Sequence, residues 1–196
     1  DYFSRVAGDW DRLRSGYFTE GVRDCAIAKA YLHPSMTVAD VGAGTGFMAA
    51  GLAPLVQLVH VLDASAEMLA VAHQNLAQFK NVVYHTANGL SLPLPEGSLD
   101  AVFANMYLHH CPEPLAALRE LVRMLRPGGR LVITDMDTHA YPWLQTEMAD
   151  VWLGFEHAQM RTWFEQAGLV NIFVDSTGEC CQAGCQSAAG EPAQIS

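Results

Sequence analysis

The stretch Val38-Ala-Asp-Val-Gly-Ala-Gly-Thr-Gly46 decides the fold of this chain. Val38 and Val41 are typical of a buried strand, and the three alternating glycines let the backbone turn sharply and approach a ligand. Residues 47–53 have the composition of a helix, so we expect the loop to place free N–H groups at a helix N-terminus. A strand, a glycine loop and a helix in this order predict a site for a nucleotide-like cofactor.

Strand and helix patterns alternate on both sides of this stretch. We expect strands at 37–41, 57–62, 81–85, 99–105 and 129–135, helices at 46–53, 66–80 and 114–125, and then a helix at 157–167 and a strand at 170–175. This alternation predicts an α/β fold with a doubly wound, Rossmann-like, mostly parallel sheet. The first 32 residues indicate two helical segments around a break at Ser15-Gly16.

The length of 196 residues fits one domain. We predict that this domain covers residues 1–178, with a helical cover at 1–35 and a cofactor-binding core at 36–135. A cysteine-containing polar tail follows at 179–196. The aromatic side chains of the cover and of residues 141–164 are expected to line a pocket; those of the cover are Tyr2, Phe3, Trp10, Tyr17 and Phe18.

The charge and apolar content of the chain limit its partners. The net charge of −10 argues against nucleic acid, because binding to a phosphate backbone rests on Lys and Arg. No apolar run reaches the roughly 18 to 20 residues that a membrane span needs, and no signal peptide is visible. We interpret the five cysteines as reduced thiols and expect a cytoplasmic protein with a small-molecule partner. The sequence does not indicate an oligomeric state.

The polar residues that follow the predicted strands form a second pattern. The carboxyl ends of parallel strands meet at one edge of the sheet, where such folds bind ligands. Asp63 ends the second strand, 19 residues after Gly44, and can accept both hydroxyls of a ribose or cap the next helix, as Ser65 could equally do. A dinucleotide fingerprint would need glycine at position 47, where the chain has Phe47.

Four landmarks in this order resemble the class I S-adenosylmethionine-dependent methyltransferases, within them the ubiquinone/menaquinone-biosynthesis type that acts mostly on small molecules. The landmarks are acid-x-Gly-x-Gly-x-Gly at 40–46, the Leu-Pro stretch at 88–100, Leu-His-His at 108–110 and Pro-Gly-Gly-x-Leu at 127–131. They cover about residues 36–135. The resemblance implies S-adenosylmethionine (SAM) as cofactor, S-adenosylhomocysteine (SAH) as product, and a seven-stranded sheet. Since the chain stops at Ser196, we expect its seventh, antiparallel strand to be truncated or absent.

The resemblance also implies the residues that bind the cofactor. These are Asp40, Gly42, Ala43, Gly44 and Gly46 in the first motif, Asp63, Ala64 and Met68 after the second strand, Asn88, Gly89 and Leu90 after the third, and Asn105 after the fourth. Asn88 departs from the acid that usually meets the adenine amino group, although its carbonyl can still accept that hydrogen bond. The chain lacks the Asn-Pro-Pro-aromatic motif of enzymes that methylate exocyclic amines of bases, which disfavours those acceptors.

Methyl transfer from a sulfonium mainly requires an acceptor held in line with the methyl group, and a base only where the acceptor must lose a proton. His109, His110 and Tyr107 are the predicted catalytic residues, with Asp135 as a further candidate base. Each has a structural alternative: the histidines could bond backbone groups, and Asp135 could cap a turn.

Three alternatives stay open. Cys111, Cys180, Cys181 and Cys185 all follow strands at the ligand-bearing edge, so an arsenite or metalloid methyltransferase using soft thiolates is one. Apart from this thiol cluster we assign no metal site. A second alternative is a non-catalytic sensor or regulatory domain that binds the cofactor. The third, a nicotinamide dehydrogenase, is disfavoured by Phe47 and by the Leu-Pro landmark.

Overall fold

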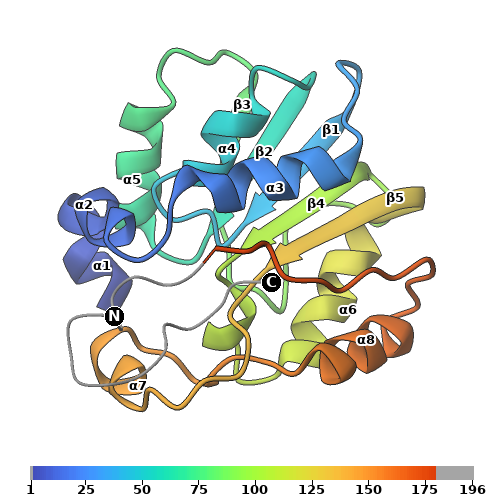
Figure 1. Cartoon of the computed structure of the whole chain (residues 1–196). Helices are drawn as coiled ribbons and strands as arrows, with labels where there is room; N and C mark the ends of the chain where they lie inside the picture. Colours follow the sequence, from blue (N-terminus) through green and yellow to red (C-terminus); the bar gives the residue numbers. More distant parts are fainter. Residues whose placement is uncertain (1, 180–196) are drawn as a thin grey trace.

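The computed structural model describes residues 2–179 of the chain. Within them, five strands form one parallel sheet in the order β3-β2-β1-β4-β5 (Figure 1). The strands are β1 (Thr37–Val41), β2 (Leu58–Asp63), β3 (Val82–Thr86), β4 (Leu99–Asn105) and β5 (Leu125–Thr134). The chain moves outward in one direction from β1 to β3 and in the other from β4 to β5. The strand order therefore reverses between β1 and β4, which is where an open α/β sheet binds its ligand.

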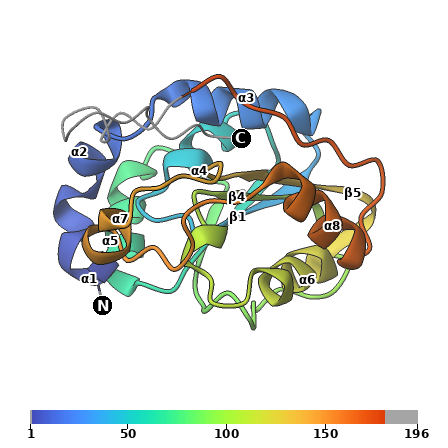
Figure 2. The same cartoon turned by 60° about the horizontal axis from the view of Figure 1, so that its bottom comes forward.

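Helices cover both faces of this sheet (Figure 2). One face carries α3 (Glu20–Ala30), α4 (Phe47–Leu52) and α5 (Ala66–Asn75), whose apolar side chains share one core cluster. The other face carries α6 (Pro114–Met124) and α8 (His157–Gln166), which share one core cluster, and α6 also packs in a second. This is the doubly wound arrangement that the sequence predicts. Strand β1 lies at its centre, and Val38 and Val41 are buried as expected.

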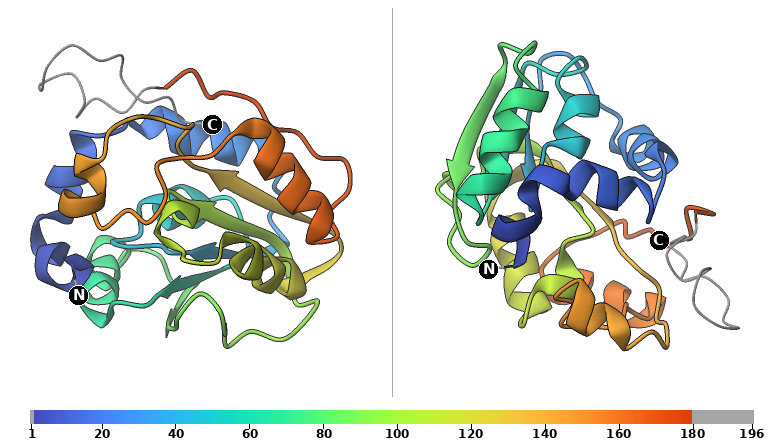
Figure 3. Two further views of the ribbon diagram at one scale, coloured as in Figure 1. Left: turned by 90° about the horizontal axis from the view of Figure 1, so that it is seen from below. Right: turned by 90° about the vertical axis from the view of Figure 1, so that its left-hand side faces the viewer.

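The first residues of the chain lie over the carboxyl end of the sheet. Helix α1 (Tyr2–Val6), the 3-10 turn η1 (Ala7–Asp9) and helix α2 (Trp10–Ser15) run beside α5 (Figure 3). Polar contacts hold them there: the Ser4 hydroxyl donates to Glu67 Oε2 at 2.7 Å, and the Thr45 hydroxyl donates to Asp11 Oδ1 at 2.6 Å. The predicted break near Ser15-Gly16 separates α2 from α3. Two further short elements are η2 (Leu108–His110) after β4 and α7 (Trp143–Glu147), which the sequence did not indicate.

Two predicted elements differ from the structure. The strand expected at 170–175 is wrong: this segment is irregular and pairs with no strand in the described chain, and Val170 and Phe173 are 79% and 86% exposed. Alternating apolar residues fit a strand, but a strand needs a neighbour to complete its hydrogen bonds. The helix expected at 66–80 ends at Asn75, whose side chain donates to Thr45 O at 3.0 Å. No helix within residues 2–179 is long and apolar enough to cross a membrane.

Candidate functional site

A cavity of about 190 Å³ opens at the carboxyl ends of β1, β2 and β4. Eight of the twelve residues predicted to bind the cofactor line it: Asp40, Gly42, Ala43, Gly44, Asp63, Ala64, Met68 and Asn105. Two of the three predicted catalytic residues, Tyr107 and His110, line it as well. The remaining lining residues, which the motifs did not single out, are Phe3, Trp10, Arg14, Phe18, Phe47, Met48 and Met106.

Three N–H groups of the glycine loop are not free, which corrects part of the expectation for this loop. The Ala43 N–H donates to Leu62 O at 3.0 Å, the Gly44 N–H to Asp63 Oδ2 at 2.8 Å, and the Gly46 N–H to Ala43 O at 2.9 Å. These three donors are satisfied within the protein. A phosphate cradle uses such N–H groups as ligands, so the loop is poorly suited to a dinucleotide pyrophosphate.

Asp40 lies at the base of the cavity and is 1% exposed. Its Oδ2 accepts the Ala49 N–H at 2.9 Å, which ties β1 to the first turns of α4. Burial raises the pKa of this carboxyl to about 7, although the Ala49 hydrogen bond opposes the shift. A carboxyl held in this way gains from a cation beside it, because a positive charge stabilises its ionised form.

Asp63 joins the glycine loop to the end of β2. Its Oδ2 accepts the Gly44 N–H and its Oδ1 accepts the Ser65 N–H, each at 2.8 Å. Burial raises the pKa of Asp63 above its usual range, against these hydrogen bonds. Helix α5 is capped by Ser65, whose hydroxyl accepts the Met68 N–H at 3.1 Å, so Asp63 is not needed as the cap. The Ala64 N–H is a third backbone donor to this carboxylate, which keeps room for at least one further donor.

Four predicted cofactor residues do not reach this cavity. A Cβ at Gly46 would lie 2.8 Å from Leu76 Cδ1, so glycine is required there by the packing of α4 on α5. Asn88, Gly89 and Leu90 follow β3, and Asn88 Oδ1 accepts the Leu90 N–H at 3.0 Å. Of these, Gly89 lies against the hydroxyl of Tyr107.

The Tyr107 ring lies between Gly42 and Gly89. A Cβ at Gly42 would collide with the ring, and a Cβ at Gly89 would collide with its hydroxyl. The Tyr107 hydroxyl is buried and has no hydrogen-bond partner within residues 2–179. Burial also raises the pKa of the phenol. A phenol that holds its proton so tightly is poorly suited to act as the base that the sequence analysis considered.

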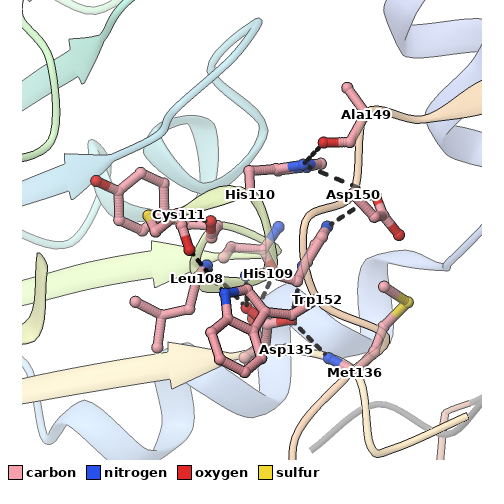
Figure 4. Close-up of polar contacts among 12 residues, drawn as sticks. Leu108, His109, His110, Cys111, Asp135, Met136, Ala149, Asp150 and Trp152 are labelled. Atoms are coloured by element: carbon pink, nitrogen blue, oxygen red, sulfur yellow. Dashed lines mark hydrogen bonds and ion pairs between the residues drawn. The ribbon is translucent and has the colours of Figure 1, made fainter. Parts of the chain in front are cut away.

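The two adjacent histidines have different surroundings (Figure 4). His109 is buried, does not line the cavity, and bonds Asp135 Oδ1 through Nδ1 at 2.6 Å. Burial alone would lower the pKa of His109, but Asp135 raises it above the usual value. His110 lines the cavity, where the Phe3 ring meets it edge-on at 4.9 Å between centroids. Burial and the charge of His109 lower the pKa of His110 to about 3, so its ring is neutral.

Asp135, the further candidate base, is not on the cavity wall. Its carboxylate accepts the Leu108 N–H at 2.9 Å and the Met136 N–H at 2.8 Å in addition to His109. His109, although burial opposes ionisation, holds the pKa of Asp135 below its usual range. The contacts of Asp135 are therefore those of its structural alternative, a cap on the turn after β4.

The N-terminal helices supply an aromatic and cationic wall to the cavity. Phe3, Trp10 and Phe18 line it as the sequence predicted for the cover, whereas no residue of 141–164 does. The Arg14 guanidinium lies 3.9 Å from the centroid of Phe47, and its Nε is buried without a hydrogen-bond partner in the described chain. Burial lowers the pKa of Arg14. The aromatic content of residues 2–18 was the one sequence signal for this wall, and nothing in it singled out Arg14.

The thiol hypothesis falls largely on residues outside the described range, since Cys180, Cys181 and Cys185 are not among residues 2–179. Cys111 is a free thiol whose Sγ donates to Tyr107 O at 3.6 Å, and burial raises its pKa to about 11. It does not line the cavity.

Several known proteins resemble this chain in sequence or in fold. A family described as a methyltransferase domain matches residues 39–133. The 2-methyl-6-phytyl-1,4-hydroquinone methyltransferase of Arabidopsis thaliana is 32% identical over 172 residues, covering 85% of this chain and 50% of that protein. A malonyl-[acyl-carrier protein] O-methyltransferase of Marinomonas is 29% identical over 167 residues, covering 81% of this chain and 60% of that protein.

Among solved structures, a SAM dependent methyltransferase from Aquifex aeolicus matches with a TM-score of 0.71 at 22% identity. The match covers 96% of this chain and 97% of that one, so the two share their fold over nearly their full lengths. The chain spans only about half the length of the curated Arabidopsis relative.

Proposed function

Because this chain belongs to the class I S-adenosylmethionine-dependent methyltransferases, we propose that its cavity binds SAM and that the protein methylates a small organic acceptor. The observation that carries the proposal is the glycine loop closed onto Asp63 beside a buried Asp40, at the switch point of the sheet. We assign the cofactor to the core at 36–135 and its covering wall to residues 1–35.

The residues on the cavity wall fit the chemical groups of SAM. The remaining acceptor capacity of Asp63 suits a ribose hydroxyl, and the buried Asp40 suits an ammonium or sulfonium cation. The loop N–H groups that are satisfied internally suit a cofactor without phosphates. Arg14, which forms no ion pair within residues 2–179, offers its charge to an anionic group of a ligand.

When bound, SAM supplies a methyl group that its positive sulfur has already activated. The protein then has to hold the acceptor in line with this group for direct displacement, and such positioning can lower a barrier by roughly 7 to 11 kcal/mol in favourable cases. Phe3, Trp10 and Phe18 wall the cavity with rings, which supports an acceptor with an apolar or aromatic body. The Arabidopsis relative is named for a hydroquinone of this kind.

His110 is our candidate for the group that accepts a hydrogen bond from an acceptor hydroxyl and orients it, because its lowered pKa makes it too weak a base to hold the proton. It is the one predicted catalytic imidazole that lines the cavity. Its Nδ1 lies 3.3 Å from Ala149 O, a contact in which Nδ1 carries the proton and donates, so Nε2 keeps a lone pair. We assign His109 to positioning and do not assign a proton transfer to Tyr107.

Turnover with methyl-labelled SAM tests this function. We expect label to pass to at least one member of a panel of hydroquinones, phenols and small carboxylic acids, and His110→Gln to lower kcat for phenolic acceptors more than it changes their KM. Arsenite belongs in the same panel, because methylation of arsenite alone would favour the metalloid alternative. Binding of SAM and SAH without turnover on any acceptor would favour a sensor instead.

The cytoplasmic location remains a prediction, since the name of the Arabidopsis relative describes that protein as chloroplastic. Exclusion of nucleic acid as partner likewise rests on the net charge of −10 alone.

A further inference from the structure

Two segments far apart in the sequence are locked together beside the cavity (Figure 4). The carbonyl oxygen of His109, in η2, accepts both the Val151 N–H at 2.9 Å and the Trp152 N–H at 3.0 Å. The Trp152 indole N–H donates to Cys111 O at 2.9 Å. These contacts hold Asp150 directly against the two histidines of η2.

The side chains in this contact leave a gap between them. Asp150 Oδ1 lies 3.6 Å from His109 Nε2 and 3.7 Å from His110 Nδ1, which is too long for a good hydrogen bond. One ligand atom from each of the three residues falls within 4.8 Å of the others. Two ligands at about 2.0 to 2.1 Å from a tetrahedral Zn²⁺ lie about 3.3 to 3.4 Å apart, so the two distances to Asp150 are a few tenths of an ångström longer than in a filled site.

The carboxylate of Asp150 is itself incompletely satisfied. Its side chain is 2% exposed, and its Oδ2 has no hydrogen-bond partner within residues 2–179. A buried carboxylate oxygen in this state is costly unless a donor or a cation meets it.

Asp135 prepares His109 to bind a cation. It accepts the Nδ1–H of His109 at 2.6 Å, which leaves the Nε2 lone pair directed at Asp150. A histidine that ligates a metal usually donates its other N–H to a carboxylate in this way. With both imidazoles neutral and both carboxylates ionised, the cluster carries a charge of −2, which a divalent cation neutralises.

We propose that His109, His110 and Asp150 bind a divalent transition-metal ion such as Zn²⁺, with Asp135 orienting His109. Two imidazoles and one carboxylate form a ligand set of open catalytic sites, which keep one position for water or substrate. His110 is the member of this cluster that also lines the cavity.

Metal binding has a consequence for His110 that rests on the proposed function. A cation on Nδ1 replaces the contact of Nδ1 with Ala149 O and moves the ring proton to Nε2. The ring then cannot accept a hydrogen bond from an acceptor hydroxyl at Nε2. Zn²⁺ is therefore expected to lower turnover of phenolic acceptors while leaving SAH affinity within about twofold, because Asp40 and Asp63 lie outside the cluster.

Metal titrations that use no acceptor test the site itself. The parent protein for these carries Cys180→Ser, Cys181→Ser and Cys185→Ser, so that tail thiols do not compete for the ion. Co²⁺ is followed by its visible absorption, and Zn²⁺ by calorimetry and by displacement of Co²⁺. We expect one ion per chain with the absorption of a nitrogen- and oxygen-ligated, four- or five-coordinate site.

Three variants of this parent locate the ligands. Loss of even an outer-shell partner weakens metal affinity about 10- to 100-fold, so Asp150→Asn and His110→Gln should each weaken binding at least that much. His157→Gln is the matched control, because His157 pairs with Asp137 at 2.8 Å in a more exposed His–Asp contact, and it should bind like the parent. SAH binding by each variant reports that it is folded.

The proposal is overturned if the parent binds no Co²⁺ or Zn²⁺ while it still binds SAH. It is also overturned if His110→Gln, whose ring is the most exposed of the three, binds the ion as tightly as the control. In either case the gap holds only a proton shared by His109 and Asp150. An absence of methyl transfer alongside normal metal binding would instead contradict the proposed function and leave the metal site standing.

Discussion

Asp40 is the residue whose charge state should follow the cofactor. Burial raises its pKa to about 7, above the ordinary value of 3.8, so the folded protein loses stability as the pH rises from about 4 to about 7. An ammonium group favours the ionised form, so its binding should strengthen as Asp40 ionises. In the protein without substitutions, we predict SAH affinity up to about tenfold higher at pH 8 than at pH 6.

In Asp40→Asn this pH dependence should be lost, since the amide does not titrate. Calorimetry at the two pH values measures both proteins. The same tenfold change in Asp40→Asn would assign the titration to another group and separate Asp40 from the ammonium.

Tyr107 and Gly89 form a second testable pair at this scale. The Tyr107 hydroxyl is buried without a partner in the described chain, so Tyr107→Phe should raise the free energy of unfolding by about 1 kcal/mol. Gly89→Ala should destabilise because its Cβ would collide with that hydroxyl, and this loss should shrink in the Tyr107→Phe background, where the nearest ring atom is 3.0 Å away.

Urea unfolding of the two single variants and the double variant measures this coupling. Gly8→Ala is the control, because a Cβ at Gly8 meets nothing within 4 Å. Additive effects would contradict the close approach of Tyr107 to Gly89, and loss of methyl transfer in Tyr107→Phe would return the phenol to the catalytic candidates.

At the scale of elements, the buried pair His109–Asp135 ties η2 to the end of β5. Removing one partner of such a pair costs about 3 to 5 kcal/mol, which is the loss we expect for Asp135→Asn. The raised pKa of His109 gives stability that is full below about pH 6.5 and fades as the pH rises through that raised value. The lowered pKa of Asp135 gives stability that is full above about pH 4 and fades as the pH falls through its lowered value.

The loss in Asp135→Asn should therefore be largest between about pH 4 and 6.5 and smaller at pH 9. Chemical unfolding across this range measures it. Asp137→Asn, whose partner His157 is 44% exposed, serves as control and should cost about 1 kcal/mol or less. Equal losses in the two variants at every pH would show that the buried pair has no special role.

The elements that the sequence predicted best are those whose hydrogen bonds close locally or on a buried neighbour. Strand β1 and helix α6 carry clear apolar periods and lie within a residue or two of their predicted bounds. Residues 170–175 carry an equally clear alternation but find no partner strand, which no local pattern could reveal. Helix α7 lacks a clean apolar period, so its position depends on the packing of distant segments.

At the scale of the whole molecule, the sequence located the cofactor side of the cavity and the aromatic part of its cover, but not Arg14. Asp40 and Asp63 follow strands, and parallel topology brings such residues together. Arg14 reaches the cavity from helix α2, and Asp150 reaches the two histidines of η2 from the segment after α7. Both positions depend on how these segments fold back over the sheet. Their roles therefore required the structure.

The central claim is that the closed glycine loop and Asp63 form a SAM site, and calorimetry with SAH tests it most directly. Each charged hydrogen bond contributes about 1.5 to 3 kcal/mol, so Asp63→Asn should weaken SAH binding about 10- to 100-fold. Asp9→Asn, which changes an exposed carboxylate paired with Arg12, should bind SAH like the parent. The account predicts one SAH per chain with this loss confined to Asp63→Asn. Absence of SAH binding by the parent protein, or unchanged affinity in Asp63→Asn, would contradict it.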